Sequence, residues 1–207
     1  MIIAIIPAKA TSSRLPGKNR FLLNGIEVYQ HAVRYAIQEG VTPIVSTDSE
    51  EIISQCKQLN ILYYRETVDD SNLCNCINQV LSKYDCEYFA VLQPTSPIRQ
   101  EGLLRNFIKC KPKTSIYTAN KIKIIGHIGN EFQIAYRDQD NSTKFLYQFD
   151  GNIVYVNTDW YKESKSLFCN DSQYCIEKLP YTLQIDEQCD YEVINAFYNY
   201  KLVNVDN

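Results

Sequence analysis

Short apolar runs and helical apolar faces alternate along the first half of the chain. Runs typical of buried strands occupy residues 2–6, 42–46, 61–64, 88–92 and 115–118. Between them, apolar residues recur at helical spacing; they are Val28, Ala32, Val33, Ala36 and Ile37, then Leu73, Ile77, Val80 and Leu81, then Leu103 to Phe107. This alternation predicts an α/β fold, a Rossmann-like three-layer sandwich with a mostly parallel central sheet covered on both faces.

Local signals mark the ends of some of these helices. Gly40 is a natural stop for the first helix. Asp48, with Glu51 three positions later, predicts a further helix with Asp48 as its cap. Because parallel strands end at one edge of a sheet, we expect the loops at that edge to bind the ligand.

The pattern changes from about residue 122. Residues 124–134 predict a hairpin, and residues 137–143 are polar and turn-prone. Two extended runs follow at residues 145–149 and 153–156. Residues 187–203 predict a helix whose inward face carries Tyr191, Ile194, Phe197 and Tyr198. We expect a single domain over residues 1–207, with an inserted β element over about residues 122–150.

Composition excludes several functional classes. The chain has 207 residues, a net charge of -3 and no basic stripe with interleaved aromatic residues, so we expect no nucleic-acid partner. No apolar stretch reaches membrane-spanning length, and the first apolar run lacks the basic segment of a signal peptide, so we expect a cytoplasmic protein without a membrane partner. Eight cysteines without a Cys-x-x-Cys pair, and two histidines, make a zinc site unexpected and favour reduced thiols.

A basic loop follows the first apolar run. It carries Lys9, Arg14, Lys18 and Arg20, and the first acidic residue is Glu27. Small residues let backbone amides approach a ligand whose charge the cations offset, so the loop suits a polyphosphate. The alternative is a solvated basic loop. Its place at the end of a buried strand and its two prolines favour the ligand, although a Walker loop and a dinucleotide glycine fingerprint are absent.

Residues 7–19 contain Pro-Ala-Lys, Ser12 and Arg-Leu-Pro-Gly-Lys-Asn. This pattern resembles the nucleotide-binding signature of the acylneuraminate cytidylyltransferase family, whose members join CMP from CTP to sialic acid and related sugar acids. Residues 92–99 closely match its Leu-Gln-Pro-Thr-Ser-Pro-Leu-Arg motif, and residues 185–190 resemble its Ile-Asp-x-x-x-Asp segment. Weaker likenesses lie at residues 45–49 and 150–155, where the family's Asn-Gly order is not kept.

The resemblance implies a role for each matching residue. For the nucleotide, these are Ala8, Lys9, Ala10, Ser12, Ser13 and Lys18 at the phosphates, and Asn19 and Arg65 at the cytosine. For the acceptor, they are Gln93, Thr95, Ser96 and Asn152, with Arg137 and Lys144 as candidates for its carboxylate by position. Lys9, Lys18 and Asp186 are the catalytic candidates.

Asp186 and Asp190 lie one turn apart at the start of the last predicted helix. The resemblance implies that they hold Mg²⁺, which bridges the triphosphate. Acidic residues at a helix start are also favoured by the helix dipole alone. Alone, two such acids indicate a helix start, but together with the basic loop they favour a metal site.

Three departures from the family bear on these roles. Lysine stands at position 9 where the family usually has arginine, which keeps the charge and loses the planar fork. A serine that contacts the base in sialic-acid enzymes falls near Cys74 here. The span between Arg99 and Gly151, which in the family holds a dimerisation arm, is short; we still expect a homodimer from the resemblance.

The sequence therefore leads to one main functional hypothesis. It is a Mg²⁺-dependent cytidylyltransferase that transfers CMP from CTP to a sugar acid of the nonulosonate type, with release of pyrophosphate, for surface glycan synthesis. The partners are CTP and a small acidic acceptor. The alternatives are a cytidylyltransferase with a phosphorylated small-molecule acceptor, and a catalytically inactive nucleotide-binding homologue.

Overall fold

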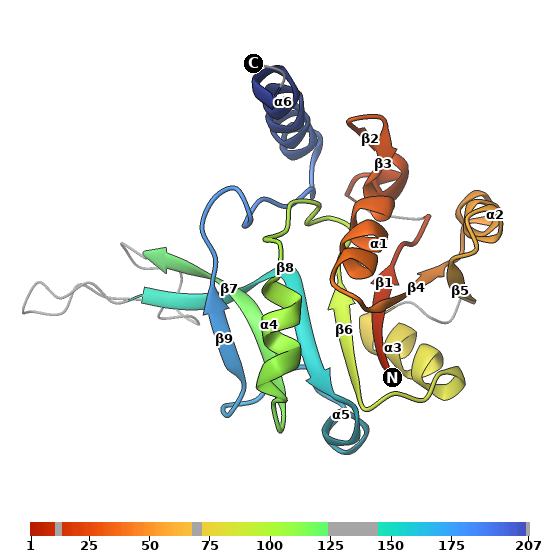
Figure 1. Ribbon diagram of the computed structural model, residues 1–207, viewed down its shortest axis with the longest axis vertical. Coiled ribbons are helices and arrows are strands. Elements are labelled where there is room, and N and C mark those ends of the chain that lie inside the picture. Colours follow the sequence, from red (N-terminus) through yellow and green to blue (C-terminus); the bar gives the residue numbers. More distant parts are fainter. Residues whose placement is uncertain (11–13, 68–71, 124–144, 206–207) are drawn as a thin grey trace, which may run out of the picture.

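A seven-stranded sheet forms the centre of the molecule (Figure 1). The computed structural model describes residues 1–10, 14–67, 72–123 and 145–205. The sheet order is β5-β4-β1-β6-β8-β7-β9, and the strands are β1 (Ile2–Pro7), β4 (Thr42–Thr47), β5 (Leu62–Arg65), β6 (Tyr88–Leu92), β7 (Ser115–Lys123), β8 (Phe145–Asn157) and β9 (Gln173–Ile176). β8 is antiparallel to both of its neighbours, and the other strand pairs of the described sheet are parallel. The predicted α/β fold with a mostly parallel sheet is confirmed.

Helices cover both faces of this sheet. They are α1 (Val28–Gln38), α2 (Glu50–Gln58), α3 (Leu73–Lys83), α4 (Leu103–Cys110) and α5 (Thr158–Ser164). The last helix, α6 (Gln188–Val205), packs in a separate apolar cluster. Along β1, Ala4 and Ile6 belong to the apolar cluster that includes α1, α2 and α4. Ile3 and Ile5, which point to the other face, belong to the cluster that includes α3 and α5. The predicted three-layer arrangement is therefore confirmed.

The strand order reverses beside β1. From β1 the chain continues outward to β4 and β5, and then returns to β6 on the opposite side of β1. In open α/β sheets, ligands bind in the crevice at the carboxyl ends of the strands where the order reverses. The loops after β1 and β6 leave the sheet at this crevice; their described residues are 8–10, 14–20 and 93–99.

β8 is bent near its middle. The two predicted runs, at residues 145–149 and 153–156, belong to this single strand, and its register with β7 shifts between Tyr117 and Ala119. At the shift, Thr118 Oγ1 donates a 2.5 Å hydrogen bond to Asp150 Oδ1. Gly151 has φ 79°, and a Cβ there would lie 2.8 Å from Gln184 Nε2, so the bend requires glycine.

Some local predictions differ from the structure. Asp48 is not the cap of α2: Ser49 precedes the helix, and its Oγ accepts from the backbone N–H of Ile52 at 3.3 Å. The 3₁₀ turn η1 (Lys18–Arg20), the hairpin of β2 (Leu22–Leu23) and β3 (Ile26–Glu27), α5 and β9 were not predicted. The expected hairpin at 124–134 and the turn-prone 137–143 lie outside the described residues.

The predicted inward face of α6 is confirmed. Ile194 is buried, and Tyr191, Phe197 and Tyr198 pack with it against Leu23, Ile98 and Ile185. Figure 1 shows α6 beside the β2–β3 hairpin. Among the described residues, no helix has the length and apolar character needed to cross a bilayer.

Candidate functional site

The loop after β1 is fastened to the end of β4. The backbone N–H of Ala8 donates to the carbonyl of Ser46 at 2.7 Å, and Thr47 Oγ1 donates to the carbonyl of Ala8 at 2.6 Å. Asp48 Oδ1 accepts from the backbone N–H of Ala10 at 2.6 Å. Asp48 therefore holds the loop that the sequence predicts to bind phosphates. Because its carboxylate is used in this contact, Asp48 does not cap α2.

Lys9 lies beside a buried carboxylate. Its Nζ is 3.2 Å from Glu66 Oε2. Ser46 Oγ donates to Glu66 Oε1 at 2.7 Å. The sequence analysis did not single out Glu66; the available signal was strand alternation, which places it on the face opposite to the exposed Arg65.

Asn19 also supports the loop. Its Nδ2 donates to the carbonyl of Lys9 at 2.7 Å, and the residue is buried. This amide nitrogen is therefore used within the protein, and the remaining oxygen is the group left for a base. The cytosine role of Asn19 stays a prediction.

Lys18 joins the first motif to the last one. Its Nζ donates to the carbonyl of Ile185 at 2.8 Å and lies 3.2 Å from Asp186 Oδ1. Arg14 Nη2 lies 3.1 Å from the same carboxylate oxygen. Lys18 is 8% exposed, whereas the Asp186 side chain is 32% exposed. Two cations and one carboxylate thus meet at the crevice, with the carboxylate open to a ligand.

Asp190 has a local structural role. Its Oδ2 accepts from the backbone N–H groups of Asp186 and Glu187, at 3.0 and 2.9 Å. This contact fastens the start of α6 in the manner of a capping box. The alternative interpretation, a helix-start acid, therefore applies to Asp190, and only its second oxygen remains for a cation.

The residues that could bind a metal ion are few. No group of three or more His, Cys, Asp or Glu side chains in the described ranges could hold one. Mg²⁺ commonly uses one or two carboxylates and takes its other ligands from substrate phosphates and water. Asp186 and the second oxygen of Asp190 fit that donor set.

The loop after β6 forms the wall next to Asp186. The backbone N–H of Ile185 donates to the carbonyl of Thr95 at 2.8 Å. Arg99 Nη2 donates to the carbonyl of Gln93 at 2.6 Å. Gln93 and Thr95 are partly exposed, as a substrate contact requires, whereas Ser96 is fully buried. Ser96 Oγ therefore does not reach a ligand in this conformation.

Asn152 links three segments below this wall. Its Nδ2 donates to Glu177 Oε2 at 2.8 Å and to the carbonyl of Tyr181 at 3.0 Å, and it lies 3.4 Å from the carbonyl of Ile98. Asn152 is fully buried. The Asn152 side chain, which the sequence analysis assigns to the substrate, therefore links segments of the protein to one another.

A buried charged cluster surrounds Asn152. Burial, followed by the charge of Asp150, raises the pKa of Glu177 to about 8. Burial lowers the pKa of Arg99 to about 10. Buried side-chain atoms that lack a hydrogen-bond partner among the described residues gather here; they are Ser96 Oγ, Arg99 Nε and Nη1, Asp150 Oδ2, Asn152 Oδ1 and Glu177 Oε1. Such atoms are costly unless water or a proton satisfies them.

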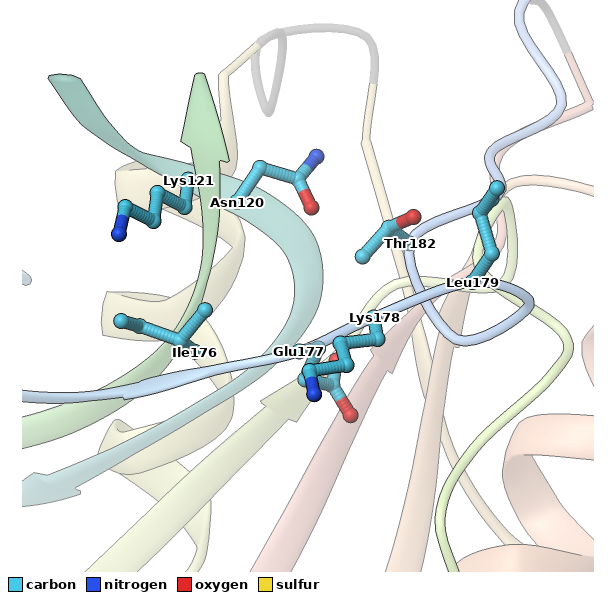
Figure 2. A pocket seen from close by; sticks show the side chains of 7 residues that line it. All are labelled: Asn120, Lys121, Ile176, Glu177, Lys178, Leu179 and Thr182. Carbon is cyan, nitrogen blue, oxygen red and sulfur yellow. The ribbon is translucent and has the colours of Figure 1, made fainter. Parts of the chain in front are cut away.

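A cavity of about 720 Å³ opens beside this cluster. Figure 2 shows Asn120 and Lys121 of β7 on one side, Leu179 and Thr182 on the other, and Glu177 and Lys178 between them. Thr182 is four residues from Asp186, so an extended chain of at most about 14 Å joins the cavity wall to the crevice. The two lysines give this cavity a positive character.

Arg65 does not join this group in the structure. Arg65 forms a bidentate pair with Glu50, through both guanidinium nitrogens and both carboxylate oxygens, on the exposed surface. Ser12, Ser13, Arg137 and Lys144 lie outside the described residues. Their roles stay predictions.

Comparison with known proteins identifies the family. A family model described as cytidylyltransferase matches residues 3–205. The chain belongs to this family. The resemblance noted from the nucleotide loop and the residues 92–99 motif is thereby confirmed.

Individual relatives agree with this assignment. An N-acylneuraminate cytidylyltransferase from Escherichia coli O18:K1:H7 is 30% identical over 212 aligned positions, which cover 93% of this chain and 51% of the relative. A CMP-N,N'-diacetyllegionaminic acid synthase from Legionella pneumophila is 32% identical over 120 positions, covering 52% of each. The chain thus spans about half the length of these curated relatives.

A solved structure shares the fold. It is a CMP:2-keto-3-deoxy-manno-octonic acid synthetase complexed with CTP, which superposes with a TM-score of 0.73 at 17% identity and covers 97% of this chain and 99% of its own. At that identity the likeness concerns the fold alone.

Proposed function

We propose that this chain transfers CMP from CTP to a small acidic acceptor, with release of pyrophosphate. The observation that carries the proposal is the contact of Lys18 with Ile185 and Asp186, because it brings the basic loop and the late acidic motif to one crevice. A loop that binds phosphate without catalysis has no need of a carboxylate beside its cations.

The chemistry is an in-line displacement at the α-phosphate. An acceptor hydroxyl forms the new P–O bond, pyrophosphate leaves with the electrons of the broken bond, and the hydroxyl proton passes to solvent or a nearby base. Such reactions depend mainly on positioning and on offsetting the negative charge that develops. Lys9 and Lys18 supply fixed positive charge, and the amides of Ala8 and Ala10 shape the loop. Asn19 and Arg65 would contact the cytosine.

We assign Mg²⁺ to Asp186, with Asp190 as the residue that holds the helix start in place. Asp186 Oδ1 pairs with Lys18 and Arg14, and its second oxygen remains for the ion, so the site combines a hard oxygen ligand with cations for the phosphates. When bound, the ion would neutralise phosphate charge.

We place the acceptor in the cavity between β7 and the segment after β9. Lys121 and Lys178 line it, and an ammonium group attracts a carboxylate. Gln93 and Thr95 belong to the loop that contacts Ile185, next to Asp186. We propose a sugar acid of the nonulosonate type, activated for surface glycan synthesis. Its negative charge matches the two lysines, and relatives of this chain are named for such sugar acids.

The assembly and the compartment follow the resemblance. We propose a homodimer, as in the acylneuraminate family. We place the reaction in the cytoplasm, where free cysteines such as the eight in this chain stay reduced.

A test is pyrophosphate release with CTP and Mg²⁺ in the presence of N-acetylneuraminate, N,N'-diacetyllegionaminate, 3-deoxy-manno-octulosonate or a sugar phosphate. We expect release with one of the sugar acids and little when UTP replaces CTP. Release with the sugar phosphate alone would move the acceptor to another class. CTP binding without release for any acceptor would favour an inactive nucleotide-binding protein.

A further inference from the structure

We propose that Glu66 is a positioning residue that fixes the ammonium group of Lys9 in the nucleotide site. The inference rests on the proposed function, since it assigns Lys9 to the phosphates of CTP. It concerns a residue that neither the motifs nor the family resemblance singled out.

Glu66 is held rigidly from two sides. Its backbone N–H donates to the carbonyl of Thr47 at 2.8 Å, and its Oε1 accepts from Ser46 Oγ at 2.7 Å. Its side chain has no exposed surface. Next to it lies Cys76, whose pKa is raised to about 12 by burial, so this neighbour is a neutral thiol at any ordinary pH. A carboxylate in such surroundings keeps one position.

Lys9 is the cation that this carboxylate faces. The distance from Glu66 Oε2 to Lys9 Nζ is 3.2 Å, and the Lys9 side chain is 29% exposed. An ammonium group has three donors. One can point to Glu66 while the others point to a phosphate, so the pair does not have to break when a nucleotide binds.

The chemistry of lysine explains why such a partner is useful. An arginine presents a planar fork whose orientation is largely preset, whereas lysine is a point charge on a flexible stem. The family resemblance places an arginine where this chain has Lys9. A fixed carboxylate at the base of the loop compensates for the flexible lysine stem, because it restricts the positions that Lys9 Nζ can take.

The pairing also explains how a carboxylate can be buried at the edge of the sheet. An ionised carboxylate without a partner is strongly disfavoured in an apolar interior. The 3.2 Å contact with Lys9 gives the buried Glu66 carboxylate a cationic partner. A purely structural ion pair would do the same, and the experiment has to separate the two roles.

The test is a double-mutant cycle with Lys9→Met, Glu66→Gln and the combined variant. Turnover is measured at saturating CTP with the acceptor found above, and affinities for CTP and cytidine are measured by calorimetry. Glu66→Gln retains an oxygen for Ser46 and should fold. The matched control is Glu39→Gln, because Glu39 is also buried and ion-paired, with Arg105 at 3.5 Å, but it accepts from the backbone N–H groups of Gly102 and Arg105, away from the loop.

We expect Lys9→Met to lower turnover about 100-fold and Glu66→Gln to lower it about 10-fold. The combined variant should match Lys9→Met within about 2-fold, because Glu66 acts through Lys9. Cytidine affinity should not change, and Glu39→Gln should lower the urea midpoint of unfolding without changing turnover.

Several results would overturn the inference while leaving the proposed function intact. They are unchanged turnover in Glu66→Gln, losses that multiply in the combined variant, or a parallel fall in the affinities for CTP and cytidine. A wild-type protein that binds no CTP and releases no pyrophosphate would overturn both.

Discussion

Lys18 Nζ donates a 2.8 Å hydrogen bond to the carbonyl oxygen of Ile185, which lies 167 positions later in the chain. The same ammonium group lies 3.2 Å from Asp186 Oδ1. Because Lys18 is buried and Asp186 is partly exposed, the lysine links the two loops and holds the carboxylate at the crevice. This relationship leads to the first two predictions.

Replacing Lys18 by alanine should abolish catalysis. The Lys18→Ala change removes a fixed charge beside the transferring phosphate and releases Ile185, so we expect turnover to fall by about 100-fold or more. The measurement is pyrophosphate release with CTP. The control is Arg20→Ala, since Arg20 belongs to the same loop but pairs with Glu27 at 3.3 Å. Near-normal rates in Lys18→Ala would contradict the assignment.

The two acidic residues of the last motif should respond differently to the loss of charge. Asp186→Asn removes the open carboxylate, so the Mg²⁺ concentration for half-maximal activity should rise about 10-fold or more. Asp190→Asn keeps an oxygen for the two backbone N–H groups that it caps, and a smaller shift is expected. Equal titration curves for wild type and Asp186→Asn would remove Asp186 from the metal site.

Lys178 should affect the acceptor and not the nucleotide. It lines the cavity beyond β9, so Lys178→Met should raise the KM for an acidic acceptor about 10-fold and leave CTP affinity unchanged. The matched control is Lys165→Met, because Lys165 follows α5 and does not line this cavity. A change confined to CTP would place the acceptor elsewhere.

Stability should depend on pH through Glu177. Its pKa is raised from 4.5 to about 8, by burial and then by the charge of Asp150, with Arg99 acting in the opposite direction. Between these two values the unfolded chain has lost the proton and the folded protein retains it, so the free energy of unfolding falls as pH rises. We expect the free energy of unfolding to fall between about pH 5 and about pH 9.

The measurement is urea unfolding of wild type and Glu177→Gln at both ends of that range. The glutamine carries no proton to lose and can still accept from Asn152, so its stability should vary less with pH. The same slope in both proteins would show that Glu177 keeps an ordinary pKa.

Much of the fold was predictable because hydrophobic periodicity records burial directly. The strand at residues 2–6 and the helical face that begins at Val28 are examples. The β2–β3 hairpin was missed although its signal was present: Asn24 and Gly25 both have positive φ values, 50° and 70°, as a two-residue hairpin turn requires. β9 was missed because its residues, Gln173–Ile176, show no clear alternation at the edge of the sheet.

The site was predictable in part for a different reason. Family motifs identified Lys18, Gln93 and Asp186, and the strand order brings their segments to one edge. The partner of Lys9 and the true role of Asp48 depend on which side chains meet across β1, β4 and β5. The spacing of residues in the sequence does not show which side chains will be in contact. The free energy of each pair also depends on its burial, which only the folded chain defines.

The packing of α6 on the hairpin after the nucleotide loop has a consequence for synthesis. Tyr191 Oη donates to the carbonyl of Leu22 at 2.9 Å, and Ile194 is buried against Leu23. A ribosome makes the strands that surround β1 well before it reaches these contacts. A nascent chain can therefore complete most of its sheet while Lys18 still lacks its carbonyl and carboxylate partners, and the crevice is completed only when the segment past residue 190 has emerged.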